Sequence, residues 1–114
     1  MAERINLERR RGDTFPIIFT LEDTTTSAPP DITGYAFRLA ADPSQTPSDS
    51  ANNIFQVTGV VPTGTDGVVQ FPLTASQADQ QPGSYFYDVQ WTDGGGAVRT
   101  IIAGRLRIVQ DIAK

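Results

Sequence analysis

The chain contains no cysteine and no histidine among its 114 residues. Without cysteine there is no disulfide framework, no thiolate nucleophile and no cysteine-based zinc site. Histidine is the side chain that most often performs acid–base chemistry near neutral pH and binds transition metals, so its absence leaves mainly carboxylates and hydroxyls for such work. We therefore expect no catalytic residues, no metal site and no cofactor, and we predict that the protein is not an enzyme.

Long apolar runs and a basic middle region are also missing. No run approaches the length of a membrane span, and the first residues lack the apolar region of a signal peptide. We expect a protein that is made in the cytoplasm and does not bind a membrane. No Lys or Arg occurs between Arg38 and Arg99, whereas several aspartates lie there. Such a segment is repelled by a phosphate backbone, so nucleic acid is not an expected partner.

Basic residues are instead concentrated at the N-terminus, at Arg4, Arg9, Arg10 and Arg11. We interpret residues 1–11 as an N-terminal arm or edge strand, and residues 12–114 as one domain, because a chain of this length has room for a single core. These four arginines are the predicted partner-binding residues. Their charge would steer the arm toward an acidic protein surface.

Apolar residues alternate with polar ones in several short segments separated by turn-forming residues. Phe15, Ile17, Phe19 and Leu21 show this period of two, which is typical of a strand with one buried face. Thr74-Ala-Ser-Gln77 matches a helix capping box. The polar stretch Ala41–Asn53 predicts a mobile surface loop. Together the segments predict an all-β fold: an immunoglobulin-like antiparallel β-sandwich of about seven strands with one short helical turn.

The segment GSYFYDVQWTDGGG (residues 83–96) places Tyr85, Tyr87, Val89 and Trp91 on one face of a strand. An exposed row of this kind would form a platform for sugar rings, and a buried row would form part of the core. We favour the core, because exposure would leave an apolar patch that is unusual on a monomer. Tyr85 follows a Gly-Ser turn, as does the tyrosine corner of immunoglobulin-type domains, in which the hydroxyl bonds to upstream backbone.

Several motifs carry a resemblance to a known family: RGDTFPIIFTL (11–21), PDITGY (30–35), PGSYFYDV (82–89) and GRLRI (104–108). The chain resembles small immunoglobulin-like structural domains of tailed bacteriophages, and is similar to the N-terminal domain of baseplate upper proteins. The resemblance implies a virion component, made in the bacterial cytoplasm, that acts as an adaptor, docking or decoration protein of capsid, tail or baseplate.

The same resemblance implies that the partners are other virion proteins, with the chain present as a homo-oligomer or in many copies on a symmetric particle. Because the chain ends soon after Gly104, we expect a docking role rather than receptor binding. The contact surfaces would be the arm Glu3–Arg11 and the strand edges, which could take up a neighbouring strand. The alternative function is a carbohydrate-binding module of the β-sandwich type, with Tyr35, Tyr85, Tyr87 or Trp91 as the stacking residues.

Overall fold

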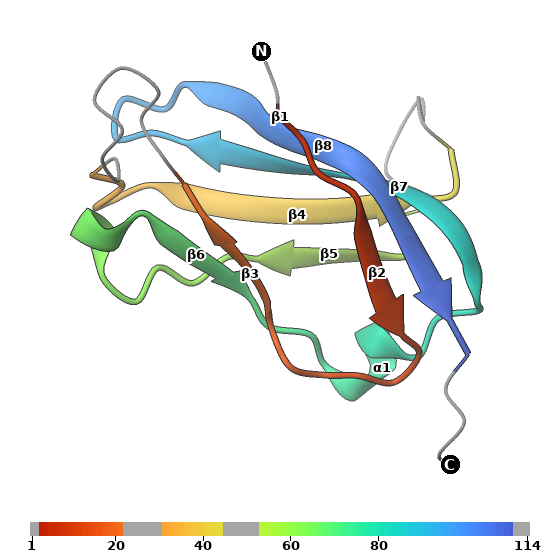
Figure 1. Ribbon diagram of the computed structural model, residues 1–114. Helices are drawn as coiled ribbons and strands as arrows, with labels where there is room; N and C mark the ends of the chain where they lie inside the picture. The colour runs from red at the N-terminus through yellow and green to blue at the C-terminus, as the bar shows by residue number, and fades with distance from the viewer. Residues whose placement is uncertain (1–2, 22–30, 45–52, 111–114) are drawn as a thin grey trace.

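The computed structural model describes residues 3–21, 31–44 and 53–110, which form two facing β-sheets (Figure 1). The expected all-β sandwich is confirmed. The larger sheet has the order β1–β8–β7–β4–β5, with β2 also beside β8, and the smaller sheet pairs β3 with β6. The elements are β1 (Glu3–Arg4), β2 (Leu7–Arg10), β3 (Ile17–Thr20), β4 (Ala36–Asp42), β5 (Phe55–Thr58), the 3-10 turn η1 (Gly64–Asp66), β6 (Val68–Phe71), α1 (Ala75–Ala78), β7 (Gly83–Thr92) and β8 (Val98–Val109).

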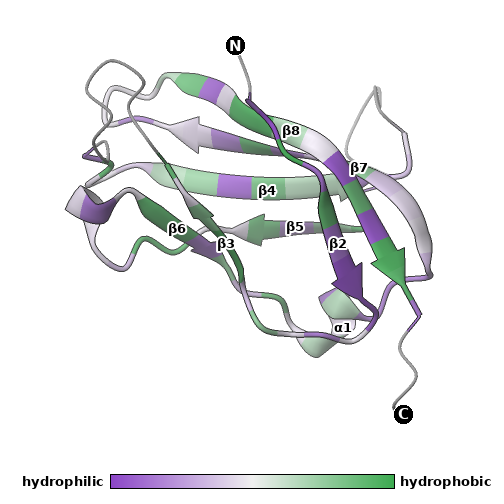
Figure 2. Cartoon of the chain, viewed as in Figure 1, coloured by the Kyte–Doolittle hydropathy of each residue, from purple (hydrophilic) through white to green (hydrophobic). Residues whose placement is uncertain are grey.

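The core lies between the two sheets and is built from the alternating apolar residues of each strand. Figure 2 shows this alternation most clearly along β8, where hydrophobic and hydrophilic residues follow one another. Residues that point inward are almost completely buried, because side chains on a strand point to opposite faces in turn. The most buried large side chains are Phe71, Ile32, Leu39, Ile102, Leu106, Val69 and Val89.

The first strand departs from the expected antiparallel arrangement. Both β1 and β2 run parallel to β8, with Glu3 opposite Ile102 and Leu7 opposite Leu106. Leu7 packs against the buried core. Residues 3–10 are therefore part of the large sheet and not a separable arm, because removing them would uncover the edge of β8 and part of the core.

A local kink divides this first strand into β1 and β2. The Ile5 carbonyl lies over Gly104 of β8 and accepts a hydrogen bond from the Tyr87 hydroxyl at 2.6 Å. The Asn6 side-chain oxygen takes its place on the ladder, accepting from the Arg105 N–H at 3.1 Å. Gly104 makes this possible, because a Cβ at residue 104 would collide with the Ile5 carbonyl. Burial raises the pKa of Tyr87, with a smaller contribution from the charge of Glu3, so the hydroxyl stays protonated as a donor.

The strand expected from Phe15 is shorter than its sequence pattern suggests. It begins only at Ile17, directly after Pro16, and Phe15 remains 64% exposed. Pro16 has no backbone N–H and cannot donate to a ladder, which explains why pairing starts after it. The prediction that Phe15 belongs to the buried row is therefore wrong.

The loop predicted for Ala41–Asn53 begins two residues later than expected, whereas its other end extends to Ile54, just before β5. Ala41 and Asp42 belong to β4 and are buried, with Asp42 only 5% exposed. The Asp42 carboxylate accepts from the Ser44 N–H and from the Asn53 side-chain amide, each at 2.8 Å. These bonds close the base of the connection, whose residues 45–52 lie outside the described part of the chain. Asp42 falls in the predicted surface loop because its bond with Asn53, at the far end of that loop, is not visible in a local sequence pattern.

The predicted helical turn is confirmed as α1, and it covers one edge of the large sheet. The Thr74 hydroxyl accepts from the Gln77 N–H at 3.1 Å while the Gln77 side chain accepts from the Thr74 N–H at 3.0 Å, which completes the capping box. The amide groups of Gln77 and Gln80 also donate to the Gln56 and Ile54 carbonyls at the outer edge of β5. These bonds occupy carbonyls that a neighbouring strand would otherwise use.

Candidate interaction surfaces

The arginines are concentrated on one face of the molecule. Arg4, Arg10, Arg38, Arg105 and Arg107 are all exposed, and their places in the strand alternation put them on the outer side of the large sheet. We call this surface the arginine face. It is basic although the chain carries a net charge of −4. The described acidic residues lie mostly in loops instead: Asp13, Asp31, Asp66, Asp79 and Asp93.

Three carboxylates also lie on this side of the large sheet: Glu8, Asp88 and Asp42, which is buried opposite Phe86. Glu8 forms an exposed ion pair with Arg107 at 3.7 Å. Asp88 lies near the middle of the sheet, between Ala40 and Ala103 on the adjacent strands. Its carboxylate has no hydrogen bond or ion pair with any other described residue, and partial burial raises its pKa. Ala40 and Ala103 have small side chains and are partly exposed, so no bulky side chain on these two positions covers Asp88.

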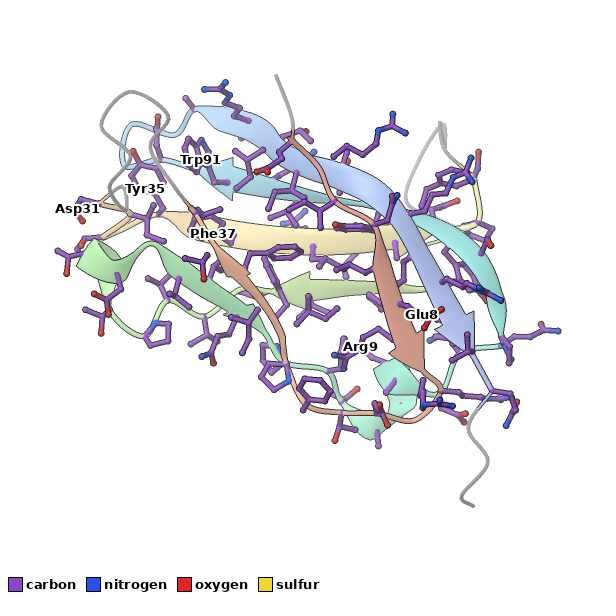
Figure 3. The ribbon with its side chains drawn as sticks, in the orientation of Figure 1. Glu8, Arg9, Asp31, Tyr35, Phe37 and Trp91 are labelled. Atoms are coloured by element: carbon purple, nitrogen blue, oxygen red, sulfur yellow. The ribbon has the colours of Figure 1, made fainter. Side chains whose placement is uncertain are left out.

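The four arginines predicted to bind a partner do not act as one group. Arg4 and Arg10 lie on the arginine face. Arg9 points the opposite way, into the space between the sheets near α1 (Figure 3). Arg11 forms an ion pair with Asp79 at 2.7 Å, while the neighbouring Gly12 N–H donates to the Ala78 carbonyl. Arg9 and Arg11 thus hold the chain between β2 and β3 in place.

Arg9 has a structural role at the end of the sandwich. Its Nη2 donates to the carbonyls of Asp13 and Phe15, and its guanidinium stacks 4.5 Å from the centre of the Phe15 ring. Its Nε is buried without a hydrogen-bond partner. Burial lowers the pKa of Arg9, and the nearby charge of Asp13 opposes that shift. These contacts give Arg9 a role in holding the end of the sandwich together.

A small recess adjoins Arg9 and is partly open to solvent. Its lining includes the apolar side chains of Ile17, Phe55, Leu106 and Ile108. Arg9 and Asp13 lie on its rim. Arg9, which is partly buried, and Asp13, which is exposed, provide one cation and one carboxylate beside the recess, and among its lining residues no nucleophile has an adjacent base.

The proposed sugar-stacking tyrosines of β7 are committed to the fold. Tyr87 is only 4% exposed and stacks on Phe19 with ring centroids 6.3 Å apart. The Tyr85 hydroxyl donates to the Gln81 carbonyl at 2.6 Å, which confirms the expected bond to upstream backbone. The row of residues 85, 87, 89 and 91 therefore faces the core. Tyr87 is therefore too buried to offer a ring face to a sugar, and Tyr85 is partly buried against the core.

Tyr35 and Trp91 lie together at the other end of the sandwich from Arg9 (Figure 3). Their rings meet edge to face with centroids 5.1 Å apart, and Trp91 makes a second edge contact with Phe37 at 6.3 Å. Both residues are partly buried and pack on the core. The pair anchors the ends of β4 and β7.

Two exposed turns beside this aromatic pair are fixed by aspartates. Asp31 accepts from the hydroxyl and the backbone N–H of Thr33, and these bonds lower the pKa of its carboxyl. Asp93 accepts from the N–H groups of Gly95 and Ala97 in the β7–β8 hairpin. In the described ranges, no cluster of three or more acidic side chains could hold a metal ion. No helix within these ranges is long and apolar enough to cross a membrane.

The sequence reasoning missed three residues of the arginine face: Arg38, Arg105 and Arg107. The signal that could have identified them is alternation, since Arg105 and Arg107 alternate with the core residues Leu106 and Ile108. Arginines spaced in this way share the face opposite the core. The sequence did not predict that Arg105 and Arg107 lie on the same face as Arg4 and Arg10, because this depends on the parallel pairing of β1 and β2 with β8.

Comparison with protein-family models and with curated proteins finds no match to this sequence.

Proposed function

We propose that this protein is a structural component of a tailed-phage virion, acting as an adaptor, docking or decoration protein through protein–protein contacts. The observation that carries the proposal is the arginine face, which gathers five exposed cations from four strands onto one side of an acidic protein. The similarity of the sequence motifs to small phage immunoglobulin-like domains supports the virion context.

The arginine face has the properties of a docking surface for an acidic protein. Arginine is enriched at protein interfaces because its planar guanidinium forms paired hydrogen bonds with carboxylates and also packs on aromatic rings. Arg105 already lies over the half-buried Phe86 ring, with 5.8 Å between the guanidinium carbon and the ring centre. Charge on this face would accelerate encounter with an acidic partner and select against basic ones. The interaction should therefore weaken as salt concentration rises.

The virion context is tested in the phage that encodes the chain. We expect mass spectrometry of purified particles to detect the protein in a fixed ratio to the major capsid or tail proteins. Expression of the protein in infected cells with none in purified particles would contradict the proposal. In a second phage carrying Arg38→Glu and Arg105→Glu, incorporation should fall sharply, whereas Arg99→Glu, a charge reversal outside the arginine face, should leave it unchanged.

The charge of the face can be measured separately with poly-L-glutamate as an acidic probe. We expect Arg38→Glu and Arg105→Glu each to weaken binding by about five- to tenfold at low salt, because each reverses one contact charge. Arg99→Glu is the matched control, since it makes the same change of net charge at the end of β8. Equal weakening by all three variants would show that only net charge matters and would count against a localised docking face.

Asp88→Asn should have the opposite effect and tighten binding to poly-L-glutamate, because it removes a negative charge from the face. The same variant should be more stable than the natural protein at neutral pH. Burial raises the folded pKa of Asp88, so its ionised form costs stability above that pKa, and this cost vanishes as the pH falls. Thermal unfolding of both proteins at pH 7 and pH 3 checks the stability difference, which should shrink at the lower pH.

Trp91→Ala separates this proposal from the carbohydrate-binding alternative. Because Trp91 packs on Tyr35 and Phe37, we expect its removal to lower the free energy of unfolding by about 3 kcal/mol. Oligosaccharides should leave the Trp91 fluorescence of the natural protein unchanged. Saturable quenching by a glycan, together with lost glycan binding in a folded Trp91→Ala variant, would favour the carbohydrate-binding function instead.

A further inference from the structure

The outer edge of β3 has no strand paired to it within the described residues, and its backbone groups are oriented for pairing. Gln70 of β6 exchanges both backbone hydrogen bonds with Val60, so it exchanges none with Ile18, which lies opposite it on β3. In an antiparallel pair the bonded positions alternate along the strand. The N–H and C=O groups of Ile18 and Thr20 therefore point away from β6, toward the open edge.

The other edges differ from this one. The large sheet is bounded by α1 at β5, where Gln77 and Gln80 bond to the edge carbonyls. At its opposite side it ends in β1 and β2, whose residues are mostly charged. Charged side chains and covering elements are the usual means of preventing unwanted strand pairing. By contrast, β3 reads Ile-Ile-Phe-Thr, and β6 also has no ionisable residue.

The geometry points to a second copy of this chain as the occupant of this edge, with β3 of one copy pairing antiparallel to β3 of the other. Each copy carries a net charge of −4, so two copies repel each other overall. The small sheet is a neutral surface on which that repulsion is weakest. It also exposes apolar side chains beside the edge, with Ile18 53% exposed and Val60 49% exposed.

The backbone orientation limits the register of the pair, because only outward-facing residues can exchange hydrogen bonds across the new edge. A two-fold axis through Phe19 places Ile18 of each copy opposite Thr20 of the other. Ile18 and Thr20 of both copies can then exchange backbone hydrogen bonds across the new edge. A shift to an axis through Ile18 would place Thr20 opposite Pro16, which has no N–H to donate. The resulting dimer joins two small sheets into one. It does not use the arginine face, so it goes beyond the proposed function, and its failure would leave that function standing.

A charge-swap experiment tests both the dimer and its register. The natural protein should show a concentration-dependent dimer by light scattering. Ile18→Glu with Thr20→Glu should weaken it at least tenfold, because glutamates of the two copies then lie directly opposite each other. Ile18→Lys with Thr20→Glu should restore it, since each lysine faces a glutamate. Both positions are exposed, and unchanged circular dichroism and melting temperature will show that each variant folds.

A cross-linking experiment gives an independent readout because the chain has no cysteine of its own. Ile18→Cys with Thr20→Cys should form a covalent dimer under mild oxidation, since directly opposite residues fall within disulfide range. Gln56→Cys with Thr58→Cys is the matched control on the covered edge and should remain monomeric. A strict monomer at millimolar concentration, or cross-linking no greater than in the control, would overturn the inference.

Discussion

We expect Phe71→Ala to lower the free energy of unfolding by about 3–5 kcal/mol, which is the usual cost of removing a fully buried aromatic ring. Phe71 has no exposed surface and makes an edge-to-face contact with Phe19, with ring centroids 6.0 Å apart. Among the described residues the small sheet consists of β3 and β6 alone, so Phe71 supplies much of its contact with the large sheet. Neighbouring side chains are too constrained to refill the space. Denaturant unfolding, followed by Trp91 fluorescence, measures the loss.

Phe15→Ala is the matched control, because it deletes the same ring from an exposed position. Phe15 contributes mainly its contact with the Arg9 guanidinium, so we expect a loss of about 1 kcal/mol or less. A comparable loss for both variants would mean that Phe15 is buried as its sequence pattern suggests. It would then contradict the strand boundary at Ile17.

Gly104→Ala should be the second most damaging substitution, with a loss of about 2–4 kcal/mol. The new methyl group would collide with the Ile5 carbonyl, which is backbone and cannot rotate away. Moving Ile5 outward would break its hydrogen bond from Tyr87 and leave that hydroxyl buried without an acceptor. The variant should therefore lose the pairing of β1 with β8 even where the rest of the sandwich remains folded.

Hydrogen exchange distinguishes this local effect from general destabilisation. In Gly104→Ala, the Ile5 and Arg105 amides should exchange much faster, because both take part in the kink. Gly94→Ala is the control: residue 94 has open space around its Cβ position and lies at the hairpin tip. Its stability should change by less than about 0.5 kcal/mol. Unchanged protection at Ile5 in Gly104→Ala would show that the first strand does not depend on that glycine.

The sequence alone determined the fold class and much of the core. Alternation along Tyr85, Tyr87, Val89 and Trp91 predicted the inward row of β7, and the Thr74–Gln77 capping box predicted α1. The Tyr85 bond to upstream backbone was predicted from the turn before it. These features are local: strand alternation, capping and turn geometry depend on residues within a few positions of one another.

Only the tertiary structure decided the orientation of the first strand and the surfaces that follow from it. The N-terminal arginines are adjacent in sequence, yet parallel pairing with β8 divides them, because alternation sends Arg9 inward and Arg10 outward. The same pairing brings Arg4 alongside β8, the strand that carries Arg105 and Arg107, about a hundred residues further along the chain. Such contacts join distant segments, and local sequence patterns such as alternation and capping do not reveal which distant edges meet.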